Sequence, residues 1–210
     1  MYKLYYSPGT CSMAVHVALL EIEAEFEIEN VAAPAGQPKS AEFLKINPRG
    51  AVPVLKIDDF ILREGAAILT FLIEDNKSDL LPASRLQRAQ ALEWLSFANS
   101  TLHPAYSKCF FQHHILGDEA ASNPLYKPSI AQIQKYWDEI EEHLTSNQYL
   151  CGDKFTVADI LVTVIANWSF AMKEQINFGA KTKVFFSRVI SRPSYQKALQ
   201  VENITYKAHL

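Results

Sequence analysis

Hydrophobic and polar residues follow two different patterns along the chain, with a change near Leu80. Before that point the apolar runs are short and are separated by Gly, Pro and Asp residues, whereas after it they recur at helical spacing over long stretches. Short runs bounded by turn residues are typical of strands and brief helices, and the longer pattern is typical of amphipathic helices. The sequence therefore predicts an α/β domain over residues 1–80 and an all-helical domain over residues 81–210.

The first domain is expected to alternate strands and helices. An aromatic-rich strand runs into the turn Ser7-Pro8-Gly9, and Asp58-Asp59 marks a hairpin. The expected elements are a strand over 2–6, a helix over 12–21, a strand in the later half of 21–29, a short helix near 43–46, strands over 53–57 and 60–62, and a helix that starts at Glu64. This β-α-β-α-β-β-α order matches a thioredoxin-like arrangement.

The second domain is expected to be a helical bundle. Helical periodicity covers residues 83–116, 124–145, 156–172 and 194–201. Thr156 and Asp159 have the spacing of a capping box, in which each side chain bonds the backbone N–H of the other residue. We interpret this pair as structural and expect it to be buried.

Composition narrows the classes of function. Of the 210 residues, 49% are hydrophobic and 20% charged, which is typical of a packed globular protein. A net charge of −3 argues against a nucleic-acid or anionic-membrane partner, and no apolar stretch reaches the ~20 residues that cross a bilayer. The first residues lack the pattern of a signal peptide, and three cysteines without CxxC spacing suit a reducing compartment. We expect a cytoplasmic protein without a metal site.

Cys11 is the first candidate for chemistry. It follows a strand and a Pro-Gly turn, and lies in the first turn of a predicted helix, where backbone N–H groups and the helix dipole lower a thiol pKa. The alternative is a small buried hydrophobic residue. Ala14 occupies the position of the second cysteine of a dithiol reductase, which weakens a role in disulfide exchange.

Two further segments suit a peptide-like ligand. Val52-Pro53 opens a strand, where a proline leaves neighbouring backbone groups available to an extended ligand; about 5–6% of X–Pro bonds are cis, so the isomer stays open. Glu64-Gly65 places a carboxylate and a backbone N–H at a helix start, which suits the two charged ends of a zwitterion. The alternative for Glu64 is a simple helix cap.

These three segments, in this order along the chain, resemble the motifs of the glutathione S-transferase family, and specifically of its bacterial beta-like class. The matching segments are Tyr5 to Ser12, Asn47 to Leu55, Leu62 to Ile68, Leu102 to Tyr106 and Gly152 to Asp159. The resemblance spans nearly the whole chain. It implies the glutathione transferase fold: a thioredoxin-like domain that binds glutathione, a helical domain that shapes the electrophile pocket, and a homodimer.

The resemblance also implies a role for each site residue. It places Cys11 beside the glutathione sulfur with Ser12 as a second donor, and sends His103 toward that thiol from the helical domain. The remaining implied contacts with glutathione are Val52 and Pro53 for the tripeptide backbone, Glu64 and Gly65 for the γ-glutamyl end, and Gln37 and Lys39 for the glycine carboxylate. Tyr106 and Trp168 would line the electrophile pocket.

The function expected is conjugation of the glutathione thiolate to small hydrophobic electrophiles, as in detoxification. One alternative is a glutathione-dependent thiol reductase or peroxidase that works through a mixed disulfide on Cys11. Another is a non-catalytic binding or stress-regulatory protein that keeps the fold.

Overall fold

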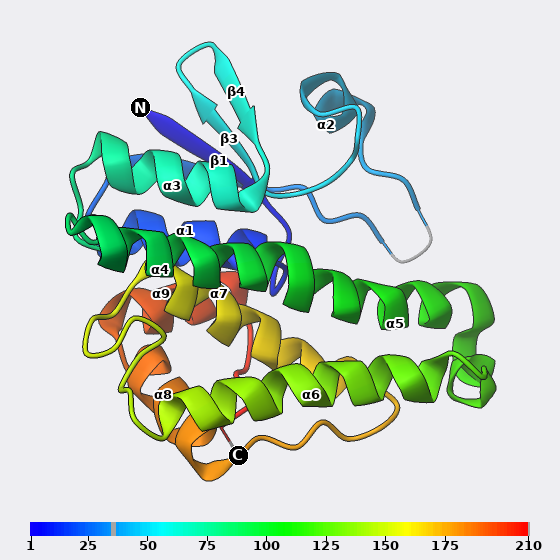
Figure 1. Ribbon diagram of the computed structural model, residues 1–210. Helices are drawn as coiled ribbons and strands as arrows, with labels where there is room; N and C mark the ends of the chain where they lie inside the picture. Colours follow the sequence, from blue (N-terminus) through cyan, green and yellow to red (C-terminus); the bar gives the residue numbers. More distant parts are fainter. Residues whose placement is uncertain (35–36, 210) are drawn as a thin grey trace. The chain divides into compact units, whose positions relative to one another are not determined.

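A computed structural model describes residues 1–34 and 37–209 (Figure 1). The chain divides into two compact units, Met1–Leu81 with Arg192–Thr205 and Pro82–Ser191 with Tyr206–Leu210. The first unit thus takes in residues 192–205, which the sequence had assigned to the helical domain. Helix α9 (Pro193–Glu202) packs against α1 (Ser12–Glu21) and so belongs to the first unit.

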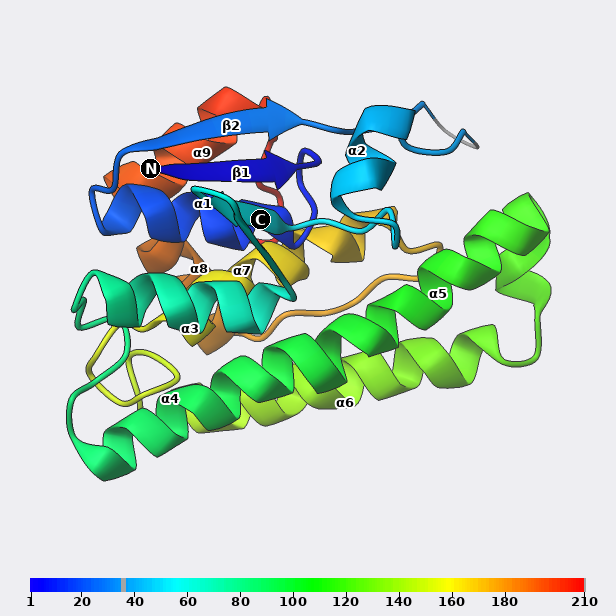
Figure 2. The same cartoon turned by 90° about the horizontal axis from the view of Figure 1, so that it is seen from above.

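The first unit contains a four-stranded sheet in the order β2-β1-β3-β4. Its strands are β1 (Tyr2–Tyr6), β2 (Phe26–Asn30), β3 (Val54–Ile57) and β4 (Phe60–Arg63). Strands β1 and β2 are parallel, as Figure 2 shows, and the other two pairs are antiparallel. The glutamates of β2 lie on an edge strand, where charged side chains oppose pairing with another sheet.

Three more helices complete this unit: α1, α2 (Ala41–Ile46) and α3 (Gly65–Asp75). Helix α1 contacts β1, α3 and α9, and its residues from Ser12 to Leu19 are buried, because the helix has neighbours on several sides. Helix α2 supplies Phe43 to a cluster with Tyr5 and Val54. The predicted order of strands and helices is confirmed.

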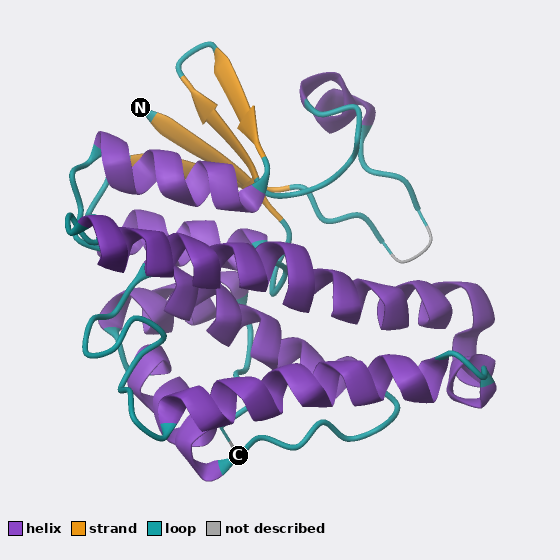
Figure 3. Ribbon diagram, in the orientation of Figure 1, coloured by secondary structure: helices purple, strands orange, loops and turns teal. Residues whose placement is uncertain are grey.

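In the described part of the second unit the regular elements are helices, drawn purple in Figure 3. Two isolated β-bridges, Tyr149–Gly152 and Cys151–Lys154, lie in the loop before α7 (Val157–Ala166). Helices α4 (Arg85–Phe97) and α5 (His103–Leu116) are joined by a π-helical turn, Ala98–Leu102, and α6 (Tyr126–Leu144) packs on α5. Helix α7 is buried throughout and continues into a 3₁₀ turn, Asn167–Ala171.

Sequence patterns missed one helix of this unit, α8 (Ala180–Ile190). Its buried residues do follow helical spacing, at Thr182, Phe185, Phe186, Val189 and Ile190. The signal was therefore present in a segment rich in β-branched and aromatic residues, which have low helix propensity.

Helix α7 begins with the predicted capping box of Thr156 and Asp159, and both residues are buried. The Asp159 carboxylate accepts hydrogen bonds from the backbone N–H groups of Thr156 (2.6 Å) and Leu150 (2.8 Å) and from the Thr156 hydroxyl (2.9 Å). Among the described residues no helix combines the length and apolarity needed to cross a membrane.

Candidate functional site

The register of the sheet brings three loop segments together at one end of the strands, which we call the sheet edge. Tyr5 of β1 pairs with Val54 of β3, and Val54 pairs with Arg63 of β4. The segment after β1, the segment before β3 and the segment after β4 therefore leave the sheet at the same edge. These segments carry Cys11, Val52-Pro53 and Glu64-Gly65.

The turn between β1 and α1 is closed by its own hydroxyl groups. The buried Ser12 hydroxyl donates to the Ser7 carbonyl (3.1 Å) and accepts from the Ser7 N–H (3.2 Å). It also lies 2.8 Å from the Thr10 hydroxyl. The Ser12 hydroxyl is thus committed to the turn, which differs from the donor role expected from the sequence. The contacts make Ser12 a residue that positions Cys11.

Cys11 is the N-cap residue of α1, but its thiol does not have the lowered pKa that the sequence suggested. Burial raises the pKa of Cys11 to about 11, although the N–H groups of Cys11 and Ser12 act in the opposite direction. The expectation was wrong because the helix start was weighed without the cost of removing a thiolate from water. At neutral pH Cys11 carries its proton, and the S–H group donates to the Val52 carbonyl at 3.4 Å.

A buried pair, Glu202 and His16, supports the turn between β1 and α1. Glu202, the last residue of α9, accepts a hydrogen bond from the Gly9 N–H (2.9 Å) and lies 2.9 Å from His16 Nδ1. Both side chains are almost completely inaccessible to solvent. Sequence reasoning missed Glu202, although it lies at helical spacing on the buried face of α9 with Tyr195, Ala198 and Leu199. A glutamate at such a position is seldom buried without a partner, and its partners Gly9 and His16 are distant in sequence.

The Val52–Pro53 peptide bond is cis. Pro53 is buried and Val52 is half-buried, and the loop before them is held by Asn47, which donates to the Ala51 carbonyl at 2.8 Å. Arg63 in turn donates to the Asn47 side-chain oxygen at 3.2 Å. The loop that carries Val52 is therefore fixed by contacts within the first unit.

Glu64 is the N-cap residue of α3 and has a φ angle of 74°, which is uncommon for a side chain other than glycine. Its carboxylate makes no capping hydrogen bond with the helix. Instead it accepts from Arg49 Nη1 at 2.7 Å. The simple capping role considered for Glu64 is therefore not what the structure shows.

The two residues expected near the glycine carboxylate differ in their surroundings. Gln37 is exposed. The Lys39 ammonium donates to the Ser7 hydroxyl (2.8 Å) and to the Val31 carbonyl (2.7 Å), and partial burial lowers its pKa. Two of its three N–H donors are thus used to hold Lys39 beside the turn that precedes Cys11.

In the second unit, His103 opens α5 and packs edge-on against Trp168, with the ring centroids 4.8 Å apart. Phe110 also contacts Trp168, at 6.0 Å. Burial lowers the pKa of His103, so the imidazole is neutral at pH 7. His103, Phe110 and Trp168 form a half-buried aromatic cluster.

Tyr106 does not have the place expected of a pocket residue. It is completely buried, and its hydroxyl accepts from Trp137 Nε1 (2.7 Å) and lies 2.5 Å from the Ser169 hydroxyl. Burial raises the pKa of this phenol far above the usual range. Tyr106 belongs to the core of the helical unit, since helical spacing alone does not distinguish a core face from a pocket wall.

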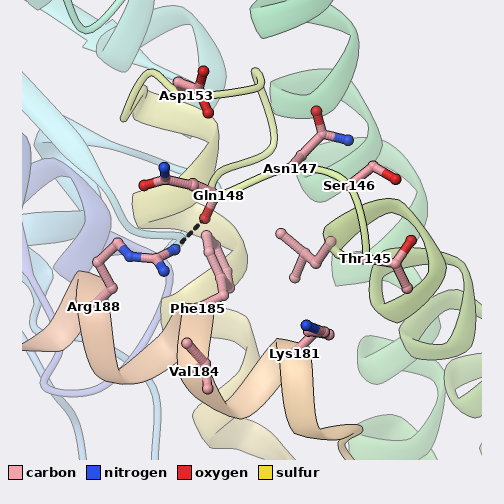
Figure 4. A pocket seen from close by; sticks show the side chains of 10 residues that line it. Thr145, Ser146, Asn147, Gln148, Asp153, Lys181, Val184, Phe185 and Arg188 are labelled. Atoms are coloured by element: carbon pink, nitrogen blue, oxygen red, sulfur yellow. Dashed lines mark hydrogen bonds between the residues drawn. The ribbon is translucent and has the colours of Figure 1, made fainter.

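The second unit also has a polar pocket of about 380 Å³ between the end of α6 and α8, shown in Figure 4. Lys181 and Arg188 of α8 lie on one side of it, and Arg188 donates to the Gln148 carbonyl. None of the site residues expected from the sequence lines this pocket.

Comparisons with known proteins place the chain. Residues 1–74 match the N-terminal domain of glutathione S-transferase, and residues 98–193 match its C-terminal domain. The chain is 30% identical over 207 residues to glutathione S-transferase GstA of Escherichia coli O157:H7, a match that covers 96% of this chain and 99% of the relative. It belongs to the glutathione S-transferase family.

Solved structures agree with this assignment. A sphingomonad glutathione S-transferase complexed with glutathione is 30% identical, with a TM-score of 0.81 over 97% of this chain and 100% of that one. A bacterial beta-class glutathione S-transferase of Sphingomonas chungbukensis is 28% identical, with a TM-score of 0.82 over the same shares. The family and the fold predicted from the sequence motifs are confirmed.

Proposed function

We propose that this glutathione S-transferase binds glutathione at the sheet edge of its first unit and conjugates the glutathione thiolate to small hydrophobic electrophiles. The observation that carries the proposal is the meeting of the Cys11 turn with the cis-proline loop, where the Cys11 sulfur lies 3.4 Å from the Val52 carbonyl oxygen. Glu64 leaves the sheet at this same edge.

The tripeptide would lie extended across this edge. The Val52 backbone pairs with the cysteinyl residue beside Pro53, and Glu64 with Gly65 receives the γ-glutamyl end. The third N–H donor of Lys39, with Gln37 two residues before it in the loop, serves the glycine carboxylate. Each of these groups lies in the first unit, which supports a complete glutathione site there.

The chemistry requires the glutathione thiol, which is mostly protonated at neutral pH, to act as a thiolate. The N–H groups at the start of α1 favour a negative sulfur. Cys11 keeps its own proton, and it can turn its S–H from the Val52 carbonyl to that sulfur when the ligand amide takes over the carbonyl. Cys11 then acts as a hydrogen-bond donor and not as the nucleophile.

The second unit would serve the electrophile. The family resemblance assigns His103 to the thiol and Trp168 to the electrophile pocket. A neutral His103 imidazole and the aromatic faces of Trp168 and Phe110 offer a surface that suits apolar, electron-poor compounds.

Glutathione should raise the melting temperature, because a ligand at 100 times its Kd stabilises the folded state by about 2.7 kcal/mol. An activated chloroarene should be conjugated when glutathione is present. The absence of a thermal shift at high millimolar glutathione would contradict the binding proposal. Binding without conjugation of any electrophile would favour a non-catalytic protein.

Detoxification, a cytoplasmic location and a homodimer complete the proposal. Free cysteines at 11, 109 and 151 support a reducing compartment. The homodimer follows from the family resemblance. Light scattering of the purified chain would test it, with a mass twice 23.7 kDa expected.

A further inference from the structure

An exposed ion pair lies at the end of the site that we assign to the γ-glutamyl residue. Arg49, in the loop after α2, donates through Nη1 to Glu64 Oε1 at 2.7 Å. The side chains are 68% and 67% exposed. An ion pair this exposed contributes only ~0–1 kcal/mol to stability, so its groups can change partners at little cost.

The backbone around the pair is fixed independently of the pair itself. Arg63, the neighbour of Glu64, donates to the Ile46 carbonyl (2.6 Å) and to the Asn47 side chain (3.2 Å). These bonds join the segment that carries Arg49 to the segment that carries Glu64. The separation of the two backbone segments is therefore set by bonds that do not involve the ion pair, and it leaves the two side chains within reach of each other.

A guanidinium next to a carboxylate complements an α-amino acid zwitterion. The ammonium of the zwitterion donates to the carboxylate, and its own carboxylate accepts two parallel N–H bonds from the guanidinium. When such a zwitterion binds, its ammonium takes the place of Arg49 beside Glu64, and its carboxylate takes the place of Glu64 beside Arg49. A neutral ligand, or one with a single charge, would leave one member without a partner.

Resting on the glutathione site proposed above, we propose that Arg49 binds the α-carboxylate of the γ-glutamyl residue while Glu64 binds its ammonium. Arg49 is then a specificity residue for the zwitterionic end of glutathione. In the ligand-free chain Arg49 pairs with Glu64, and on binding it changes from Glu64 to the substrate carboxylate.

Two glutathione analogues separate the two charges. 4-Aminobutyryl-Cys-Gly lacks only the α-carboxylate, and glutaryl-Cys-Gly lacks only the ammonium. Kd values for both analogues and for glutathione would be measured by calorimetry with wild type, Arg49→Ala, Glu64→Gln and the control Lys45→Ala. Lys45 is an exposed cation in α2 with no role in the site.

Arg49→Ala should weaken glutathione binding by about tenfold, the order expected for a hydrogen bond between charged groups, and should leave the aminobutyryl analogue within about twofold. Glu64→Gln should weaken the binding of glutathione and of the aminobutyryl analogue, and it should leave the Kd of the glutaryl analogue, which has no ammonium, unchanged. Lys45→Ala should match wild type for all three ligands, and melting curves would verify that each variant is folded.

Equal losses for both analogues in Arg49→Ala, or tighter glutathione binding in that variant, would overturn the role of Arg49 and leave the glutathione site standing. Failure of wild type to bind glutathione would instead overturn the site and this inference together. The two failures are thus distinguishable.

Discussion

Two buried carboxylates, Glu202 in the first unit and Asp159 in the second, perform a similar task with different partners. Each accepts a backbone N–H from a loop that leads into a helix, α1 for Glu202 and α7 for Asp159. Asp159 lies three residues from its main partner, whereas Glu202 lies 193 residues from Gly9.

The difference between a local and a distant partner matters for function, because it decides whether the loop is stabilised by its own side chains or by another segment. The loop before α7 is saturated by its own capping box, and no residue in it has a role in the proposed chemistry. The turn before α1 is held by a hydrogen bond from Gly9 to Glu202 of α9. The Cys11 thiol therefore does not have to stabilise the turn, and it lies beside the Val52 carbonyl. Support from a distant segment lets a turn be rigid while its exposed side serves a ligand.

The largest expected effect tests the distant support. Glu202→Ala leaves His16 buried without its partner and removes the acceptor of the Gly9 N–H, which should lower the free energy of unfolding by about 3–5 kcal/mol. Urea unfolding would measure it, with Glu25→Ala as an exposed control in the same unit. A loss equal to that of the control would show that the turn supports itself.

Asp159→Ala should cost about 2 kcal/mol, the upper end for loss of a helix cap, because the cap is buried. Asp153, an exposed carboxylate in the preceding loop, provides the matched control Asp153→Ala. A similar small loss in both variants would mean that the box contributes little.

The Asp159 effect should also depend on pH. Burial raises the pKa of Asp159 to about 7, so the folded chain keeps a proton that the unfolded chain has released between pH ~4 and pH ~7. The stability contribution of this group is complete below pH ~4 and is lost as the pH rises to ~7. Unfolding curves across this window should show a smaller decline in Asp159→Ala than in wild type.

The turn before α1 and the loop before α7 each contain a glycine with a positive φ angle, so the same substitution can be made in both. Gly9 and Gly152 have φ angles of 68° and 73°, where a side chain costs about 1–2 kcal/mol. A methyl group at Gly9 would also lie 3.0 Å from Ile204 Cδ1, whereas one at Gly152 meets nothing closer than 3.9 Å. Gly9→Ala should therefore lower the melting temperature more than Gly152→Ala does. The opposite order would show that Ile204 shifts without cost.

The smallest expected effect concerns Cys11. Because the thiol is protonated at neutral pH, a serine hydroxyl should replace it as donor, and Cys11→Ser should keep the conjugation rate within about tenfold, or ~1.4 kcal/mol. Any mixed disulfide with glutathione, measured by mass spectrometry, should disappear. Loss of conjugation beyond a hundredfold would show that the sulfur itself is required.

The sequence by itself determined the features that depend on neighbours along the chain. The capping box of Thr156 and Asp159 needs only a spacing of three residues, and the strands and helices of the first unit need only alternation, periodicity and turn residues. The family motifs are likewise short continuous segments, and the comparisons agree with them.

Only the tertiary structure decided which groups lose contact with water and which distant groups meet. Burial reversed the expected pKa of Cys11 and placed Tyr106 in the core, and the packing of α9 on α1 brought Glu202 to Gly9. The Arg49–Glu64 pair depends on the sheet register in the same way. Local patterns report backbone preference, whereas desolvation and long-range pairing depend on every segment packed around a group, and no single segment of sequence contains that information.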